Sequence, residues 1–280
     1  MSKICIVMDY GHRLTTPGKR TVPLPHVIHE RTMNEGYGSV TANLFRKAGC
    51  EVLEVAPDKN AALNENTDLN QRIAKANTWA SKQTGQAYYI SCHANAGGGQ
   101  GAEVWIWSGS KAGGKEEQAA KLVLDKLCAA TGMKNRGVKR GYPGNPSANF
   151  AVNRDTKMLS MLIECGFMDY VPEASKMDNP DFWKICGTAV YEGMAEFLGL
   201  KQNSQPCPNN KEMYLVTFGH CSTGDKNTAV ALGEKLGLSC NVTQENGLFL
   251  VTYSPMTNGD KAAIFQLGEQ LTVPVQSQVV

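Results

Sequence analysis

Three short stretches of the sequence place a histidine or an acid among small residues at or just after an apolar run. They are MDYGH, ending at His12, SCHAN, with His93, and LIECGF, with Glu164. The apolar runs predict buried strands, so each polar side chain comes near the carboxyl end of a strand. In a parallel sheet these ends share one edge, where ligands bind. We therefore expect the three side chains, about 80 and 70 residues apart, to meet at one site.

The two histidines could bind a metal ion together with a third ligand. Neutral imidazoles bind zinc through a ring nitrogen, and a catalytic zinc site takes three protein ligands and leaves one position open. The stretch PHVIHERTMNEGYG offers His26, His29, Glu30 and Glu35 as the third ligand. Glu35 falls in the first turn of a predicted helix, where the helix dipole would also explain an acid. Glu30 falls in the loop before that helix, but spacing alone does not choose among the four.

Glu164 is expected to be largely desolvated, because it lies inside the apolar stretch SMLIECGFM. A buried carboxylate must be paired with a base, bound to a metal or used in catalysis. If the role of Glu164 is structural, we expect a salt bridge to Arg154 or to another base.

The nine cysteines stand singly, without a Cys-x-x-Cys pair. An odd number in this pattern indicates reduced, mostly buried thiols rather than disulfides or a cysteine zinc site. Cys92 and Cys165 adjoin the candidate site in sequence, so a nucleophilic cysteine is the alternative chemistry.

Strand-like and helix-like segments alternate over the first 200 residues. The predicted strands are 3–8, 51–56, 87–92, 102–107 and 159–165. The predicted helices are 37–48, 70–82, 115–131 and 181–198. This alternation predicts an α/β fold, a twisted, mostly parallel sheet covered by helices, in a first domain of residues 1–200.

The composition changes after this domain. Residues 201–211, KQNSQPCPNNK, are polar and contain two prolines, which predicts a linker. In the second domain, residues 212–280, segment 214–236 matches segment 249–271 at ten of 23 positions without a gap. Each copy reads as a strand, a Gly-Asp-Lys turn and a helix, so we expect a small α+β domain built from a doubled βαβ repeat, with both helices on one sheet. His220 aligns with Pro255 in the repeat, which argues against a ligand role.

Charge and hydropathy exclude several classes of partner. The net charge is +2, and no basic stripe accompanies it, so we expect no nucleic-acid partner. The apolar runs are far shorter than the roughly 20 residues that cross a bilayer, so we expect no stable membrane insertion. The N-terminal apolar run is too short for a signal peptide and no small-residue cleavage site follows, which predicts synthesis in the cytoplasm.

Together these motifs resemble a known family. The chain shows DYGH, then Glu30 with Asn34 four residues on, LNQRIAKAN, SCHAN and NRDTKMLSMLIECGFMD, in this order. The series is similar to the zinc-dependent N-acetylmuramoyl-L-alanine amidases of the amidase-3 type, over residues 4 to about 198. It departs from that pattern at Arg13, where a second glycine is usual, and at Leu159, where proline is common.

The resemblance implies a site and a reaction. It implies Zn²⁺ bound by His12, Glu30 and His93, with Glu164 assisting catalysis, and it selects Glu30 from the four candidates. Zinc would lower the pKa of a bound water to about 7, and Glu164 would accept the proton of that water. The substrate would be bacterial cell-wall peptidoglycan, cut between N-acetylmuramic acid and L-alanine of the stem peptide. The alternative from another class is a non-catalytic peptidoglycan-binding protein with a vestigial metal site.

The second domain is similar in size and element order to SPOR-type peptidoglycan-binding modules and to the C-terminal domains of clostridial phage endolysins. This implies cell-wall binding, and an oligomerisation domain that makes a homo-oligomer is the alternative. Together with synthesis in a host cytoplasm, the resemblance favours a clostridial phage endolysin that acts at the wall once the membrane is permeabilised. A host sporulation or autolytic amidase is the near variant.

Overall fold

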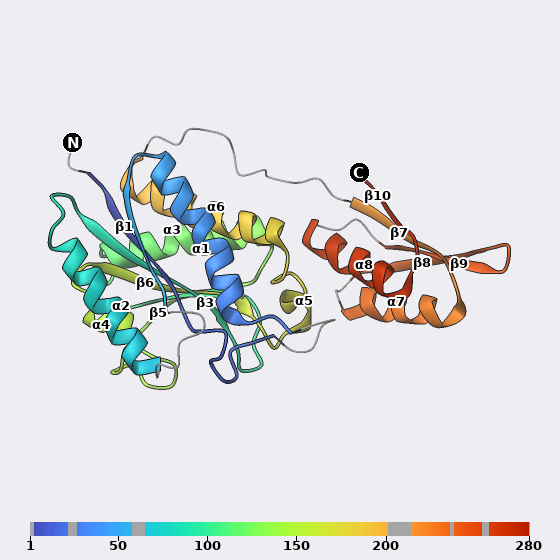
Figure 1. The fold of residues 1–280 in the computed structure, drawn as a ribbon, viewed down its shortest axis with the longest axis horizontal. Helices are drawn as coiled ribbons and strands as arrows, with labels where there is room; N and C mark the ends of the chain where they lie inside the picture. The colour runs from blue at the N-terminus through green and yellow to red at the C-terminus, as the bar shows by residue number, and fades with distance from the viewer. Residues whose placement is uncertain are drawn as a thin grey trace.

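The computed structural model describes residues 3–21, 27–57, 65–200, 214–235, 238–253 and 258–279. The predicted linker, residues 201–211, lies outside these ranges, and the division into domains on either side of it stays a prediction. The described residues form two separate sheets with helices (Figure 1).

The first sheet has six strands in the order β2-β1-β3-β6-β4-β5. They are β1 (Cys5–Tyr10), β2 (Glu51–Val55), β3 (Ala87–Asn95), β4 (Ala102–Ile106), β5 (Asn135–Arg140) and β6 (Leu159–Phe167). Strands β2, β1, β3 and β6 pair in parallel, as predicted. Strand β4 runs antiparallel to β6 and parallel to β5. The starts of β4 and β5 therefore lie at the same edge as the carboxyl ends of β1, β3 and β6.

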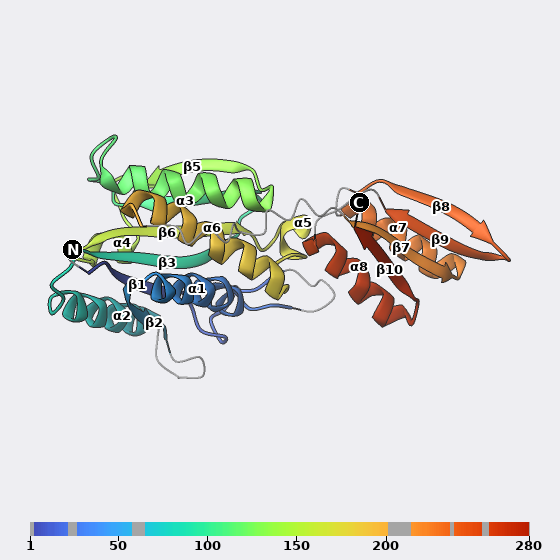
Figure 2. The ribbon, with the colours of Figure 1, turned by 90° about the horizontal axis from the view of Figure 1, so that it is seen from above.

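Helices cover both faces of this sheet. They are α1 (Glu30–Lys47), α2 (Glu65–Ala80), α3 (Lys115–Thr131), α4 (Ala151–Asp155), α5 (Val171–Ala174) and α6 (Pro180–Leu198). Figure 2 shows α3, α6 and α1 side by side over one face, where they bury alternate strand residues such as Ile6, Ile90 and Ile163. Helices α2 and α4 cover the other face, over Val7, Tyr89 and Leu162. The fold is the predicted mostly parallel α/β arrangement.

Local sequence explains where α6 begins and where α3 and α6 end. Helix α6 begins after Asn179, whose side chain accepts a hydrogen bond from the backbone N–H of Asp181, and Pro180 occupies its first turn. Helices α3 and α6 end at Gly132 and Gly199, both in the left-handed conformation that glycine adopts without strain. The predicted start of the first helix at residue 37 is wrong, because α1 begins at Glu30.

The second sheet is antiparallel, with the strand order β10-β7-β9-β8. Its elements are β7 (Tyr214–Cys221), α7 (Thr223–Lys235), β8 (Cys240–Glu245), β9 (Leu248–Tyr253), α8 (Asn258–Leu271) and β10 (Val275–Val279). Each copy of the repeat forms a split βαβ unit, because β9 lies between β7 and β8, and β7 lies between β9 and β10. This is a ferredoxin-like arrangement.

The small core under the second sheet reproduces the sequence repeat. Val216 and Val251, Phe218 and Tyr253, and Ala229 and Ile264 are pairs at the offset of 35, and all six residues are buried together. Helices α7 and α8 pack on the same face of the sheet, as predicted (Figure 1). Among the described helices of the whole chain, none is both long enough and apolar enough to cross a bilayer.

Candidate metal centre

His12 lies just beyond the end of β1, in a backbone conformation held by α1. Its φ of 65° is in the left-handed region, which is uncommon for a residue with a side chain. The buried Arg31 donates from Nη1 to the carbonyl of His12 at 3.3 Å. Asn34 donates from Nδ2 to the carbonyl of Gly11 at 3.2 Å. The first turns of α1 therefore fix the direction in which the His12 imidazole points.

His93 lies inside β3, two residues before its end, rather than beyond it. The Tyr37 hydroxyl accepts a hydrogen bond from the backbone N–H of His93 at 2.9 Å and donates to its carbonyl at 3.2 Å. The imidazole lies over Gly11, and a Cβ there would come closer than 3.0 Å to three of its ring atoms. The ring therefore occupies space that only glycine leaves open.

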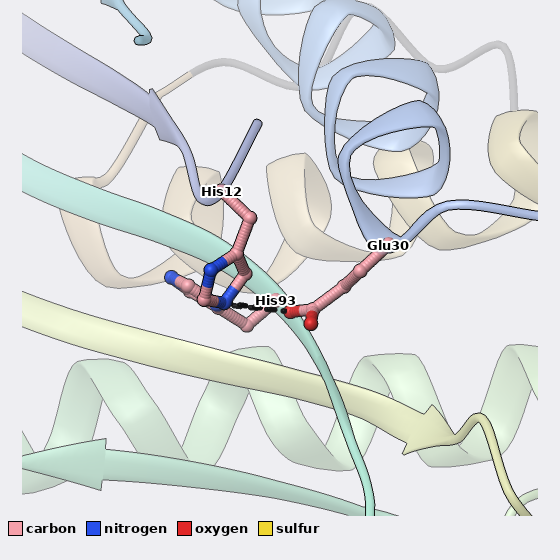
Figure 3. A group of neighbouring side chains, drawn as sticks. All are labelled: His12, Glu30 and His93. Atoms are coloured by element: carbon pink, nitrogen blue, oxygen red, sulfur yellow. Dashed lines mark hydrogen bonds and ion pairs between the residues drawn. The ribbon is translucent and has the colours of Figure 1, made fainter. Parts of the chain in front are cut away.

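Glu30 is the first residue of α1, so the prediction that it lies in a loop before the helix is wrong. Its side chain points from the helix N-terminus toward both histidines (Figure 3). Oε1 lies 3.4 Å from Nε2 of His12 and 3.0 Å from Nδ1 of His93, and it accepts a hydrogen bond from the Ala94 N–H at 3.1 Å. Burial raises the pKa of Glu30, but the charge of His12 and the hydrogen bond and charge of His93 outweigh it and lower the pKa to about 2.

The donor set of these residues suits a zinc ion. The ligand-capable atoms of His12, Glu30 and His93 all lie within 4.8 Å of one another. Two imidazole nitrogens and one carboxylate form the set found in catalytic zinc sites. Oε2 of Glu30 is enclosed and accepts no hydrogen bond from a described residue, and Lys19 Nζ lies 3.9 Å away. A buried carboxylate oxygen without a donor is the kind of atom that a cation satisfies.

The other candidates for the third ligand do not join this group. His29 precedes α1 and pairs with Arg20 in an isolated β-bridge. Glu35 lies in the second turn of α1, not the first, and its carboxylate is 3.6 Å from Arg31 Nε. His26 lies outside the described residues.

Glu164 lies directly across from His93 in the pairing of β3 and β6, inside the strand rather than after it. Its Oε2 is enclosed and has no hydrogen bond to a described residue. Burial raises the pKa of Glu164 well above its usual value, and the charge of Glu30 raises it further. Arg154 is bound to Asp155, with Nη2 and Oδ2 2.7 Å apart. Arg154 is therefore not the partner of Glu164 that the structural interpretation named first.

The two cysteines near the site are not activated nucleophiles. Cys92 and Cys165 are completely buried. Burial raises the pKa of Cys92 well above its usual value. A hydrogen bond to Cys186 and burial raise the pKa of Cys165. Both thiols stay protonated near neutral pH, so the alternative chemistry of a nucleophilic cysteine is not supported.

A buried charge pair under the site was not predicted from the sequence. Asp9 accepts from Arg72 Nε at 2.6 Å and from Ser91 Oγ at 2.7 Å, and all three residues are buried. Arg72 lies in the LNQR stretch of α2, so this pair joins that helix to β1. The sequence shows the acid in MDYGH and the base in LNQR. Their spacing, however, does not indicate that the two side chains meet.

The chain is similar to other proteins over part of its length. It is 30% identical over 141 residues to the N-acetylmuramoyl-L-alanine amidase CwlM of Bacillus licheniformis, covering 50% of each protein. It is 31% identical over 149 residues to the endolysin of Bacillus phage SPP1, covering 52% of this chain and 51% of that protein. The chain thus spans about half the length of these two relatives.

A solved structure shares the fold. Cwp6 from Clostridium difficile matches 71% of this chain and 30% of its own chain, with a TM-score of 0.60 and 24% identity. The model of the Amidase_3 family, described as N-acetylmuramoyl-L-alanine amidase, matches residues 6–196. Since this match covers more than half of the chain and includes His12, Glu30, His93 and Glu164, the chain belongs to the Amidase_3 family of N-acetylmuramoyl-L-alanine amidases.

Proposed function

We propose that the chain hydrolyses the amide bond between N-acetylmuramic acid and L-alanine of the peptidoglycan stem peptide. The observation that carries this proposal is the meeting of His12, Glu30 and His93 beside the enclosed carboxyl of Glu164, in a chain of this family. Zinc is the proposed cofactor, held by the first three residues. When bound, zinc would supply a Lewis acid that polarises the scissile carbonyl and lowers the pKa of water.

We assign proton transfer to Glu164. Its enclosed position and raised pKa suit a carboxyl group that accepts a proton from the attacking water and returns it to the leaving amine of L-alanine. Tyr37 and Asn34 orient the ligands, because they hold the backbone at His93 and Gly11. The ordered backbone keeps the three ligand side chains in place through the reaction.

Mass analysis of digested peptidoglycan tests the proposed reaction. We expect free amino termini on L-alanine and intact glycan strands, and we expect a chelator to stop the digestion. Glu164→Gln should lower turnover by about 10²- to 10⁴-fold while about one zinc per chain remains. New sugar reducing ends or cuts within the peptide would contradict the assignment. Loss of zinc from Glu164→Gln would make Glu164 a ligand, and wall binding without any cleavage would favour the non-catalytic alternative.

We further propose a phage endolysin, made in the host cytoplasm and acting at the wall after the membrane is permeabilised. Likeness to the SPP1 endolysin supports this setting, and a host sporulation or autolytic amidase stays the alternative. Produced inside clostridial cells, the chain should leave the culture turbid until a membrane-permeabilising agent is added, and the culture should then clear within minutes. Clearing that needs no permeabilisation would favour the host amidase.

We also propose that residues 212–280 bind the cell wall, after a linker at 201–211 and a catalytic domain at 1–200. The second sheet supports this division of the chain, because it has a buried core of its own.

A further inference from the structure

A row of functional side chains continues across the sheet beyond Glu164. His93 pairs directly with Glu164, and Glu164 pairs directly with Glu103 on β4. Directly paired residues point to the same face of a sheet, so these side chains lie side by side. Glu103 is only 3% exposed. The edge that holds the candidate metal centre therefore carries another buried carboxylate, which the proposed reaction does not use.

The contacts of Glu103 show that it positions an arginine. Oε1 accepts hydrogen bonds from Asn95 Nδ2 and from Trp105 Nε1, each at 2.9 Å. Oε2 accepts from Nε of Arg136, on β5, at 2.7 Å. Both carboxylate oxygens thus have donors, and the carboxylate fixes the guanidinium group at its Nε end.

Two further contacts orient Arg136. The guanidinium lies 4.8 Å from the centre of the Phe167 ring, and Nη1 donates to the carbonyl of Gln100 at 3.4 Å. Nη2 has no partner among the described residues, and 32% of the side chain is exposed. A guanidinium held on one side and open on the other is preorganised to bind a carboxylate through its outer amino groups.

We propose that Arg136 binds a free carboxylate of the stem peptide and so determines which stem peptides the enzyme prefers. This inference rests on the proposed amidase function. Glycan strands of N-acetylated sugars offer no free carboxylate at the scissile muramoyl unit, because its lactyl carboxyl is in the amide, whereas the stem peptide carries acids. The ligand is therefore on the peptide side of the scissile bond.

Distance limits which peptide residue carries the carboxylate. Neighbouring strands are about 4.8 Å apart, so Glu103, two strands from His93, lies about 10 Å away from it. An extended peptide advances about 3.3 to 3.6 Å per residue. The guanidinium beside Glu103 therefore matches an acid on the second or third residue. The candidates are the α-carboxylate of D-glutamate at the second residue and the side-chain carboxylate of diaminopimelate at the third.

Matched substrates and variants test the proposal. The substrates are disaccharide tetrapeptides with an amidated C-terminus and with D-glutamate or D-isoglutamine at the second residue, each made with lysine or diaminopimelate at the third. We expect the wild type to prefer a carboxylate form by about 10- to 100-fold in kcat/KM, from a charged hydrogen bond. Arg136→Gln should abolish that preference by raising KM, with little change in kcat and no change for the substrate that lacks both acids.

The control is Arg140→Gln, which removes the same charge at the other end of β5, where Arg140 is paired with Glu117. It should keep the preference. Arg136→Gln leaves the buried charge of Glu103 without its cationic partner, so the double variant Glu103→Gln/Arg136→Gln is measured beside it, with zinc content and melting temperature as checks on folding. The single variant and the double variant should both lose the preference for substrates with a carboxylate.

The outcomes separate the two proposals. Loss confined to D-glutamate substrates, or to diaminopimelate substrates, supports the inference and identifies the residue. A wild type without preference, or an equal loss on all four substrates in folded variants, overturns it while the amidase function stands. No release of peptide from any substrate by the wild type overturns the amidase function itself.

Discussion

At the residue scale, the missing side chain of Gly11 matters as much as the three candidate ligands. The His93 imidazole lies where a Cβ of residue 11 would stand, and the carbonyl of the same glycine accepts a hydrogen bond from Asn34. Gly11 therefore affects both histidines. It leaves room for the His93 ring, and its anchored backbone leads directly into His12. Its conservative replacement tests the geometry of the site without touching a ligand.

We expect Gly11→Ala to push the His93 ring out of place and to lower zinc affinity by about 10- to 100-fold, as outer-shell changes do. Packing strain should also cost about 1–3 kcal/mol of unfolding free energy. Competition with a chromophoric chelator measures the affinity, and denaturant melts measure the stability.

Gly224→Ala is the matched control, because a Cβ there would meet only Ser222 Oγ, at 3.8 Å. It should leave zinc affinity unchanged. Wild-type zinc affinity in Gly11→Ala would contradict the placement of His93 over this glycine.

The sequence identifies some site residues and hides others for a physical reason. His12, His93 and Glu164 stand out because polar groups beside buried strands are costly unless they are used. Glu30 does not stand out, because acids are common near the start of a helix. Only the resemblance to the family motif selected Glu30 over His29 as the third ligand. Tyr37 looks like a core residue of an amphipathic helix, and its contacts with His93 depend on packing that spacing does not encode.

At the scale of elements, function also explains where prediction failed. The first turns of α1 bury Glu30, Arg31 and Asn34, so the apolar periodicity that marks a helix begins only near Tyr37. The predicted helix therefore started at residue 37 instead of 30. By contrast, α3 serves only packing, shows an uninterrupted apolar stripe, and was predicted at 115–131, the bounds that the structure shows.

Strand β5 was missed altogether. Its sequence, NRGVKR, has a single apolar side chain, because it is an edge strand and only partly buried. Without β5, the sequence could not place Arg136 beside the edge that holds the candidate metal centre. The short helices α4 and α5 were missed as well, since four or five residues show no period.

At the scale of the whole molecule, the buried clusters fall into two groups, which suggests two separable tasks. The buried cluster of the second sheet contains only residues from 214 onward, and the two large clusters contain only residues up to 200. If residues 212–280 hold the chain on an insoluble wall, they raise its local concentration there, and they leave the proposed chemistry itself unchanged.

We expect removal of residues 201–280 to lower the rate on intact walls by on the order of 10²-fold. The rate on soluble muropeptides should not change. Cosedimentation with purified walls measures the binding. Equal cosedimentation of the full and shortened chains would contradict a wall-binding role, and a change from oligomer to monomer in light scattering would assign oligomerisation instead.

The exchange of strands in the second sheet has a consequence for its assembly. Each copy of the repeat places its own two strands apart and receives a strand of the other copy between them. A chain with only one copy could not close this sheet alone, because its central hydrogen bonds would lack a partner. A chain with one copy would have to pair with a second such chain, as a two-fold dimer with exchanged strands, to complete the four-stranded sheet.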